Sequence, residues 1–410
     1  MSGAVLTATR VRTCKSVAEF RDAVGAISEY GAWEIDDETA ERFLRVHPLD
    51  RMHAAFEGKK AVGGAGAFPF EFSVPGGSVA CAGITVVGVY PTHRRRGILT
   101  AMMRAQLDAT HERGDPIAAL WASDERIYGR YGYGLASLVG EIELPRQHGA
   151  FAEPFESRGA IRYVEGGDVP GLLAPVWEHV FRERPGVFAR TQDWWEMRVV
   201  LDLPQRRGSA GPKRFAVVDA GDGVEGYAVY RHAPNWDAGI DAGKIAVSEV
   251  LAKTLRAERE LWRYLLDMEW ASKISARLLP LDHPLFWILA EPRRMRMRVG
   301  DGLWVRLIDV GAALSARSYS AAGPIVFQVV DDFCSWNHGR WKLEDGEAKK
   351  TRAEADLACD VTALASVYLG GFTFAQLVRG GRLEELKPGA AARADAMFRT
   401  DVQPWCPEIF

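Results

Sequence analysis

The order of predicted secondary-structure elements occurs twice within the first 300 residues of the chain. In each copy, helical segments precede a β-hairpin and a β-branched strand, and an amphipathic helix and a short strand follow. The first copy has helices within 17–45, strands at 60–72, 78–89 and 116–121, a helix at 98–113 and a further strand at 141–144. The second has helices within 169–200, strands at 215–218, 227–232, 245–251 and 272–279, and a helix at 256–268. The repeat predicts two related α+β domains, although residue identity between the copies is low.

A polar, proline-bearing stretch at 145–159 separates the copies, and a third pattern begins near Gly302. This pattern has strands at 304–308, 324–330 and 339–343, and helices at 361–369 and 391–398. Because one hydrophobic core rarely exceeds about 250–300 residues, a chain of this length needs several. We therefore expect three α+β domains, at residues 1–150, 151–300 and 301–410.

The composition excludes several classes of protein. Lys and Arg number 51 and Asp and Glu 54, a near balance that is not typical of a dedicated nucleic-acid binder. The five cysteines are scattered and form no C-x-x-C pair, which indicates reduced thiols and no structural metal. The first residues lack the apolar run of a secretory signal, and no stretch is long enough to span a bilayer. We expect a cytoplasmic protein that uses neither a metal nor a membrane.

Residues 87–99 carry the strongest chemical signal in the chain. A β-branched strand enters a turn with Arg94, Arg95 and Arg96, and Gly97 precedes an amphipathic helix. A helix start presents unpaired N–H groups and a positive dipole end to an anion, and glycine lets a bulky anion come close. A solvated arginine cluster is the alternative interpretation. The buried strand before the cluster and the low charge of the helix after it favour a phosphate site.

This segment resembles the pyrophosphate loop Q/R-x-x-G-x-G/A of the GCN5-related N-acetyltransferases (GNAT). Arg94, Gly97 and Leu99 occupy its three defined positions, although Leu99 is larger than the usual small residue. The resemblance implies that acetyl-CoA binds here, with Arg95 as a further contact. It also implies that the backbone of Val87 and Val89 pairs with the pantetheine arm and polarises the thioester carbonyl.

Motifs along nearly the whole chain are similar to one branch of this family, the enhanced intracellular survival (Eis) acetyltransferases. They are Pro91–Gly97, Ala122-Ser123, Ile127–Gly134, Gly302–Arg306, Tyr368–Gly370 and the terminal Phe410. The resemblance implies two GNAT-like domains followed by a sterol-carrier-protein-like domain, and assembly as a homohexamer. It implies acetylation of aminoglycosides and related cationic amines, with Ser123 among the acetyl-CoA contacts.

The implied reaction is direct attack of a neutral amine on acetyl-CoA, without a covalent acyl-enzyme. By resemblance, Tyr128 protonates the departing thiolate and the carboxylate of Phe410 enters the first domain's site. Whether that carboxylate accepts the proton through water or only orients the amine stays open. A frayed terminus is the alternative for Phe410, but the apolar tail 405–410 favours docking.

Four acidic residues are candidates for the substrate pocket, and the sequence does not decide which of them faces it. They are Glu29, Glu34, Asp36 and Asp37. The penultimate acid of the family is replaced here by Ile409. A polyamine needs an anionic pocket, so we expect the charge of this pocket to differ from that of the family. Glu408 is not expected to compensate, because adjacent side chains point differently.

The second copy has no glycine at the equivalent turn, and Glu258 and Glu260 at its helix start would repel phosphates. The sequence therefore predicts one acetyl-CoA site per chain. A non-catalytic lipid-binding or scaffolding protein with relic GNAT folds is the alternative function. The intact Arg94–Gly97 loop together with Tyr128 favours the enzyme.

Overall fold

The computed structural model describes residues 9–31, 34–158, 161–219, 221 and 223–410. Contacts divide the described chain into two units. Unit 1 comprises the residues up to Ala136, Leu303–Thr400 and Phe410, and unit 2 comprises Ser137–Gly302 and Asp401–Ile409. Within the described residues, no helix is both long and apolar enough to cross a membrane.

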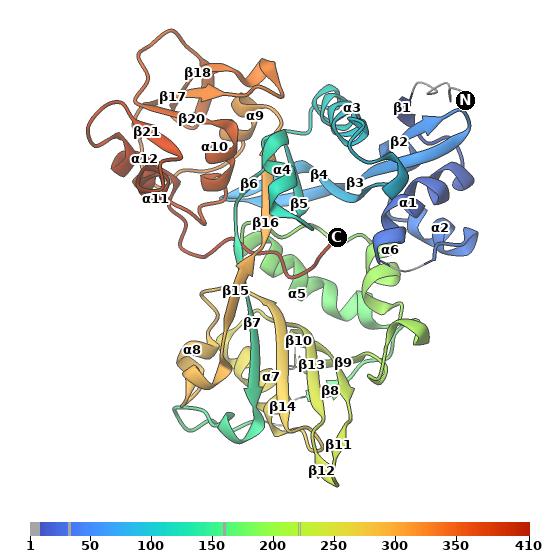
Figure 1. The fold of residues 1–410 in the computed structure, drawn as a ribbon. Helices are drawn as coiled ribbons and strands as arrows, with labels where there is room; N and C mark the ends of the chain where they lie inside the picture. The colour runs from blue at the N-terminus through green and yellow to red at the C-terminus, as the bar shows by residue number, and fades with distance from the viewer. Residues whose placement is uncertain (1–8, 32–33, 159–160, 220, 222) are drawn as a thin grey trace. The chain divides into compact units, whose positions relative to one another are not determined.

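A seven-stranded sheet with the order β1-β2-β3-β4-β5-β16-β6 forms the centre of unit 1 (Figure 1). Its strands are β1 (Arg10–Thr13), β2 (Met52–Glu57), β3 (Lys60–Val74), β4 (Gly77–Val89), β5 (Ile117–Trp121), β6 (Gly134–Leu135) and β16 (Leu303–Leu307). β3 and β4 form the predicted hairpin, and Gly76 takes a φ of 78° in its turn. β4 pairs in parallel with β5, across the connection that contains the predicted helix.

The helices that accompany this sheet in unit 1 include the one predicted at 98–113. They are α1 (Val17–Gly31), α2 (Asp37–Leu44), α3 (Ile98–Glu112) and α4 (Glu125–Tyr128), with 3-10 turns η1 (Leu49–Arg51), η2 (Pro91–His93) and η3 (Gly129–Tyr131). α3 buries Ile98, Met102 and Leu107 on one face. It ends before Gly114, which adopts the left-handed conformation expected after a helix.

Two strands belong to other sheets than the sequence predicts. The strand expected to open the third domain, at 304–308, is β16, and it lies between β5 and β6 in the first sheet. The strand expected at 141–144 is β7 (Leu138–Pro145), and it pairs with strands of unit 2. Both assignments were wrong because an apolar alternation specifies a strand but not the distant partner with which it pairs. The units therefore change at 136/137 and 302/303, whereas the three-domain division at 150 and 300 stays a prediction.

The sheet of unit 2 has the order β15-β7-β14-β13-β10-β9-β8. Besides β7 its strands are β8 (Ile161–Tyr163), β9 (Arg214–Asp219), β10 (Val224–Ala233), β13 (Lys244–Ala252), β14 (Lys273–Leu279) and β15 (Arg298–Asp301), and a small hairpin joins β11 (Trp236–Asp237) and β12 (Ile240–Asp241). β9, β10 and β13 are antiparallel neighbours, and β13 pairs in parallel with β14. This arrangement repeats that of β2 to β5, so the predicted duplication of element order is present in three dimensions.

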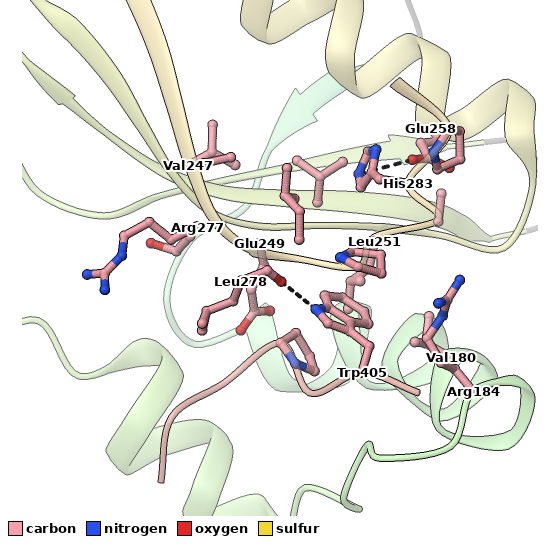
Figure 2. Close-up of a pocket in the computed structure, with 18 of the residues that line it drawn as sticks. Val180, Arg184, Val247, Glu249, Leu251, Glu258, Arg277, Leu278, His283 and Trp405 are labelled. Atoms are coloured by element: carbon pink, nitrogen blue, oxygen red, sulfur yellow. Dashed lines mark hydrogen bonds and ion pairs between the residues drawn. The ribbon is translucent and has the colours of Figure 1, made fainter. Parts of the chain in front are cut away.

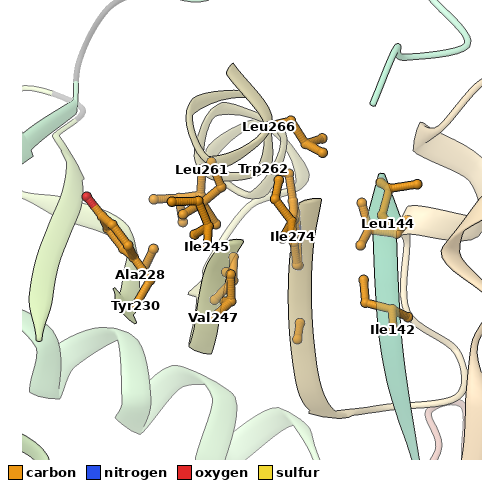
Figure 3. Packing of buried hydrophobic residues seen from close by; sticks show 14 of the residues in the cluster. Ile142, Leu144, Ala228, Tyr230, Ile245, Val247, Leu261, Trp262, Leu266 and Ile274 are labelled. Atoms are coloured by element: carbon orange, nitrogen blue, oxygen red, sulfur yellow. The ribbon is translucent and has the colours of Figure 1, made fainter. Parts of the chain in front are cut away.

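Unit 2 is held together by an apolar layer between its sheet and one long helix (Figure 3). Its helical segments are α5 (Val169–Glu183), α6 (Gln192–Trp194), α7 (Leu255–Asp267) and α8 (Leu285–Ile288), with a π-helical turn η5 (Trp195–Val200) and 3-10 turns η4 (Arg146–His148), η6 (Pro204–Arg206) and η7 (Pro292–Met295). Leu261, Trp262 and Leu266 of α7 lie over Ile245 and Ile274 of the sheet. Each such buried side chain contributes about 1.5–3 kcal/mol through removal from water.

A second, five-stranded sheet in unit 1 has the order β19-β18-β17-β20-β21. Its strands are β17 (Ile325–Val330), β18 (Gly339–Glu344), β19 (Glu347–Lys350), β20 (Leu357–Asp360) and β21 (Leu383–Glu385). Its helical segments are α9 (Val310–Ser315), α10 (Val361–Val367), α11 (Phe374–Arg379), α12 (Ala390–Phe398) and a 3-10 turn η8 (Ser335–Asn337). Rings of Phe327, Phe374 and Phe398 meet in its core.

Candidate active site

β4 and β5 separate partway along their length. Their parallel pairing covers only Cys81–Gly83 on β4, while β4 continues beside β3 as far as Val89. A bulge lies between these two regions, where Val86 takes a φ of 46° and the register with β3 shifts. Within the described residues, the edge of β4 that carries Val87 and Val89 has no strand partner on the β5 side.

One partner of this edge was missed by the sequence analysis. The hydroxyl of Tyr30, near the end of α1, donates to the carbonyl oxygen of Val89 at 2.6 Å. The guanidinium of Arg94 lies 5.8 Å from the centroid of the same tyrosine ring. An aromatic residue on an amphipathic helix carries no sequence signal for such a position, because tyrosine is common in protein cores.

The loop after β4 presents open backbone to solvent at the start of α3. Arg95 and Gly97 take left-handed φ values of 61° and 77°. Among the residues that the structure describes, no side chain caps the first turn of α3. A Cβ placed on Gly97 would meet no atom of the described chain within 4 Å. Unpaired amides, a positive dipole end and free space therefore coincide where the sequence predicts phosphate.

The three arginines of this loop have different surroundings. Arg96 is ion-paired with Glu57, and the same carboxylate lies 3.3 Å from Nε2 of His93. In the part of the chain that the structure describes, neither Arg94 nor Arg95 has an acidic partner, and both are exposed. Leu99, another predicted acetyl-CoA contact, is the second residue of α3, and it is half-buried. Arg94 and Arg95 are the cations left to meet an anionic ligand.

Tyr128 is the last residue of α4, and its side chain is buried. Burial raises the pKa of Tyr128, and a hydrogen bond with Ser123 opposes part of that shift. Asp124 caps the start of this short helix, and its carboxylate accepts from the amide of Arg126 at 3.0 Å. The structure thus brings Tyr128 and Ser123 together, and Tyr128 keeps its proton at neutral pH.

The neighbouring tyrosines hold the loop in place. The hydroxyl of Tyr131 lies 3.3 Å from Oγ1 of Thr100, in the first turn of α3. Tyr133 is fully buried, and its ring meets that of Tyr128 edge-on with centroids 6.1 Å apart. These contacts give Tyr131 and Tyr133 packing roles beside Tyr128.

The terminal residue is docked. Phe410 is only 8% exposed, and its ring lies edge-on to that of Phe70 on β3. Phe70 in turn covers Gly83, where an added Cβ would lie 2.2 Å from its ring. Because Gly83 is the last β4 residue paired with β5, Phe410 is placed in unit 1 beside the point at which these strands separate.

The four predicted pocket acids fall into two groups. Asp36 caps α2 by accepting from the amide of Thr39 at 2.7 Å, and Asp37 pairs with Arg21 at 2.7 Å. Glu29 and Glu34 are exposed. Asp36 and Asp37 therefore have local structural roles. Of the four predicted acids, Glu29 and Glu34 are left to meet a cation.

Glu408 is engaged elsewhere, within unit 2. Its carboxylate accepts from Nη2 of Arg190 at 2.7 Å and from Nε1 of Trp194 at 3.0 Å. It therefore does not take the place of the family's penultimate acid. Ile409, which occupies that position, is 47% exposed.

The equivalent region of the second copy is built differently. Parallel pairing of β13 with β14 ends at Val247, and a cavity of about 220 Å³ follows. The chain's own tail lines this cavity, and the indole of Trp405 donates to the carbonyl oxygen of Leu278 (Figure 2). At the start of α7, Oγ1 of Thr254 accepts from the amide of Ala257 at 3.2 Å, so this helix start is capped.

The comparisons with known proteins agree along the chain. Acetyltransferase (GNAT) domain models match residues 16–136 and 186–307, and a sterol carrier protein domain model matches residues 310–407. An uncharacterized N-acetyltransferase of Streptomyces avermitilis is 39% identical over 391 residues, which cover 94% of this chain and 95% of that protein.

Mycobacterial acetyltransferases are also similar to this chain. N-acetyltransferase Eis of Mycobacterium tuberculosis is 33% identical over 383 residues, covering 90% of this chain and 91% of that protein. The crystal structure of Eis1 from Mycobacterium abscessus superposes with a TM-score of 0.85 at 32% identity, covering 98% of this chain and 100% of that one. The chain is therefore an N-acetyltransferase with two GNAT domains and a sterol-carrier-protein-like domain, and it belongs to the Eis family.

Proposed function

We propose that this protein transfers the acetyl group of acetyl-CoA to an amine of a small cationic substrate, such as an aminoglycoside or another polyamine. One observation carries the proposal. The uncapped start of α3, opened by Gly97 and flanked by Arg94 and Arg95, lies directly after the unpaired edge of β4. This combination suits a ligand with a pyrophosphate at one end and an amide-bearing arm at the other.

Different residues of the site bind different parts of acetyl-CoA. The amides from Gly97 to Leu99 and the side chains of Arg94 and Arg95 bind the pyrophosphate. The backbone of Val87 and Val89 pairs with the pantetheine arm, as an added strand would. Ser123 and Tyr128, which are joined by a hydrogen bond, lie at the thioester end.

The chemistry is a direct acyl transfer. The amine nitrogen attacks the thioester carbonyl, the C–S bond breaks, and Tyr128 gives its proton to the thiolate. The proton that the amine loses passes through water towards the carboxylate of Phe410, and solvent restores Tyr128. Reference pKa values of about 10 for tyrosine and 8.5 for a thiol make the transfer to sulfur uphill by about 2 kcal/mol. It therefore has to accompany C–S cleavage at hydrogen-bond distance.

An acyl-cysteine intermediate is disfavoured by the state of the thiols. All five cysteines are reduced and buried. Burial raises the pKa of Cys14, Cys359 and Cys406 to about 12, and it also raises that of Cys334. A buried thiol with a raised pKa is a poor nucleophile, because the thiolate is the reactive form.

The substrate's charge follows from the acids near the site. Glu29 near the end of α1 and Glu34 in the connection between α1 and α2 are exposed acids, and the terminal carboxylate of Phe410 adds a further negative charge. A polyamine offers several ammonium groups to such a surface while one deprotonated amine reacts. By resemblance to the Eis family, we also propose a homohexamer that works in the cytoplasm.

The direct test measures thiol release from acetyl-CoA with a panel of aminoglycosides and linear polyamines, and identifies the products by mass spectrometry. We expect release that depends on the amine and a mass increase of one acetyl group per modified amine. Release that no cationic amine accelerates would rule out the proposed substrate class. Light scattering of the purified protein tests the hexamer separately.

A further inference from the structure

A fully buried ion pair connects the two sheets of unit 1. Arg306 lies on β16 of the seven-stranded sheet, and Asp331 directly follows β17 of the five-stranded sheet. Nη2 of Arg306 donates to Oδ2 of Asp331 at 2.6 Å, and the two side chains are 0% and 1% exposed. The free-energy cost of removing two such charges from water is about as large as their mutual attraction. A contribution to stability therefore does not by itself explain why this ion pair is present.

The carboxylate of Asp331 is held from three sides. Besides Arg306, it accepts from the amide of Cys334 at 2.9 Å and from Nδ2 of Asn337 at 2.9 Å. Asn337 also donates to the carbonyl oxygen of Ile308 at 3.1 Å, just beyond the end of β16. The loop 331–337 is thus fastened to β16 and fixes the orientation of the Arg306 guanidinium.

The guanidinium lies with one face against the turn that follows Tyr128. A Cβ placed on Gly132 would lie 2.6 Å from Cζ, 2.6 Å from Nη1 and 2.8 Å from Nε of Arg306. These nearly equal distances mean that the guanidinium plane faces the side of Gly132 on which a Cβ would lie. Gly132 takes a φ of 85° and donates to the carbonyl oxygen of Gly129 at 3.0 Å, which closes the turn.

The same loop contacts the Tyr128 segment and α3 through aromatic rings. Phe333 lies edge-on to Tyr131 with centroids 5.2 Å apart, and the guanidinium of Arg104 lies 3.7 Å from the centroid of Phe333. Trp336 stacks on His111 near the end of α3, at 4.3 Å. The loop 331–337, which lies inside the segment matched by the sterol carrier protein model, therefore supports both α3 and the turn after Tyr128.

We propose that Arg306 and Asp331 are positioning residues for acetyl transfer, which hold the turn Gly129–Gly132 and thereby keep Tyr128 in its reactive position. In this view the sterol-carrier-protein-like domain is a structural part of the acetyltransferase site. The proposal rests on the proposed role of Tyr128 as the acid, and the test separates the two.

The test uses the full chain with Arg306→Lys, Tyr128→Phe and the double variant. Lysine keeps a positive charge beside Asp331 but loses the planar face against Gly132. We expect Arg306→Lys to lower kcat by about 10- to 100-fold, as a misplaced catalytic group does, with little change in KM for acetyl-CoA. Because Arg306 acts through Tyr128, the double variant should be no slower than Tyr128→Phe alone.

A matched control is Arg317→Lys. Arg317 is also a buried arginine of unit 1, and it donates to the carbonyl oxygens of Tyr368 and Phe398, away from the turn. The variant Arg317→Lys should lower the melting temperature as much as Arg306→Lys does. It should not cause a comparable loss of kcat. Equal losses of kcat in the two variants would mean a general effect of stability and would overturn the proposal.

Hydrogen exchange of the segment 125–133 measures the turn without any turnover. Exchange there should rise in Arg306→Lys and not in Arg317→Lys, and unchanged exchange overturns the proposal. A normal kcat in Tyr128→Phe, by contrast, removes the acid role and with it any positioning through Tyr128. The kcat losses of Arg306→Lys and Tyr128→Phe could instead multiply in the double variant. Tyr128 would then remain the acid, but Arg306 and Asp331 would not act by positioning it, and the proposal would be overturned.

Discussion

The ring of Phe410 packs edge-on against that of Phe70, with centroids 4.9 Å apart. Phe70 also stacks on Phe68 at 5.4 Å, so the last side chain of the protein adds to an aromatic cluster on β3. The ring accounts for the burial of the terminus, and the carboxylate is a separate group on the same residue. The two can therefore be altered independently.

Amidating the terminus by semisynthesis should abolish most of the turnover without unfolding the protein, because it removes the charge and keeps the ring. Appending residues after Phe410 should have the same effect, since the charge then leaves its place. The measurement is kcat with a polyamine, beside a melting curve. Near-normal turnover of the amidated protein would leave proton acceptance to Glu29, Glu34 or solvent.

Gly97 and Gly114 lie at opposite ends of α3 and form a matched pair for mutation. Their φ values are 77° and 79°, and a Cβ at either position would meet nothing described within 4 Å. Alanine at each should cost about 1–2 kcal/mol of stability, the price of a left-handed backbone. Only Gly97→Ala should also weaken acetyl-CoA binding in calorimetry, because its methyl group enters the phosphate site. Equal affinities in the two variants would place the pyrophosphate elsewhere.

The elements that could be predicted from sequence are those with local signals. The Pro75-Gly76-Gly77 turn specifies the β3–β4 hairpin, and apolar periodicity with Gly114 specifies α3. The phosphate loop is also local, since its arginines, its glycine and the helix start are adjacent in the chain. Tyr128 and Ser123 are brought together by a single short helix.

What could not be predicted depends on partners far away in the chain. β16 pairs with β5 although more than 180 residues separate Trp121 from Leu303 in the chain. The sequence of β16 does not indicate that β5 is its partner. From the sequence alone, Arg306 would be expected to point from an apolar strand into solvent. In the structure it is buried because it pairs with Asp331. The place of Trp405 beside Leu278 is likewise set by tertiary packing.

Glu258 should make stability depend on pH. Burial raises its pKa to about 7, while Arg184 opposes the shift, and the neighbouring His283 stays neutral because burial lowers its pKa to about 3. Between the unfolded pKa, about 4.3, and 7 the folded state holds the extra proton, so the contribution of Glu258 to stability falls as pH rises through this window.

Glu258→Gln should therefore raise the melting temperature relative to the wild type at pH 8 but not at pH 5. The expected gain is about 3–4 kcal/mol, from a shift of two to three pKa units at 1.36 kcal/mol each. Glu178→Gln, an exposed carboxylate paired with Arg182 on α5, is the control and should show no such pH dependence. A difference between Glu258→Gln and wild type that is the same at both pH values would contradict the assignment.

Acetyl-CoA should bind once per chain, at α3 and not at α7. The first turn of α3 has no side-chain cap in the described part of the chain, whereas Thr254 already occupies an amide in the first turn of α7. Glu258 follows in that same turn and adds a charge that repels phosphates once it ionises. Trp405 lines the cavity where β13 and β14 separate, in place of a pantetheine arm.

Calorimetry should therefore give a stoichiometry of one for the wild type. Thr254→Gly is the informative variant, because it removes the cap and supplies the missing glycine without restoring the arginines. It should leave the stoichiometry at one, since Glu258 and the tail remain. Gly97→Ala should weaken that single site and reveal no second one behind it. Two equivalent sites in the wild type, or a residual site of unchanged affinity in Gly97→Ala, would assign acetyl-CoA to the second copy as well.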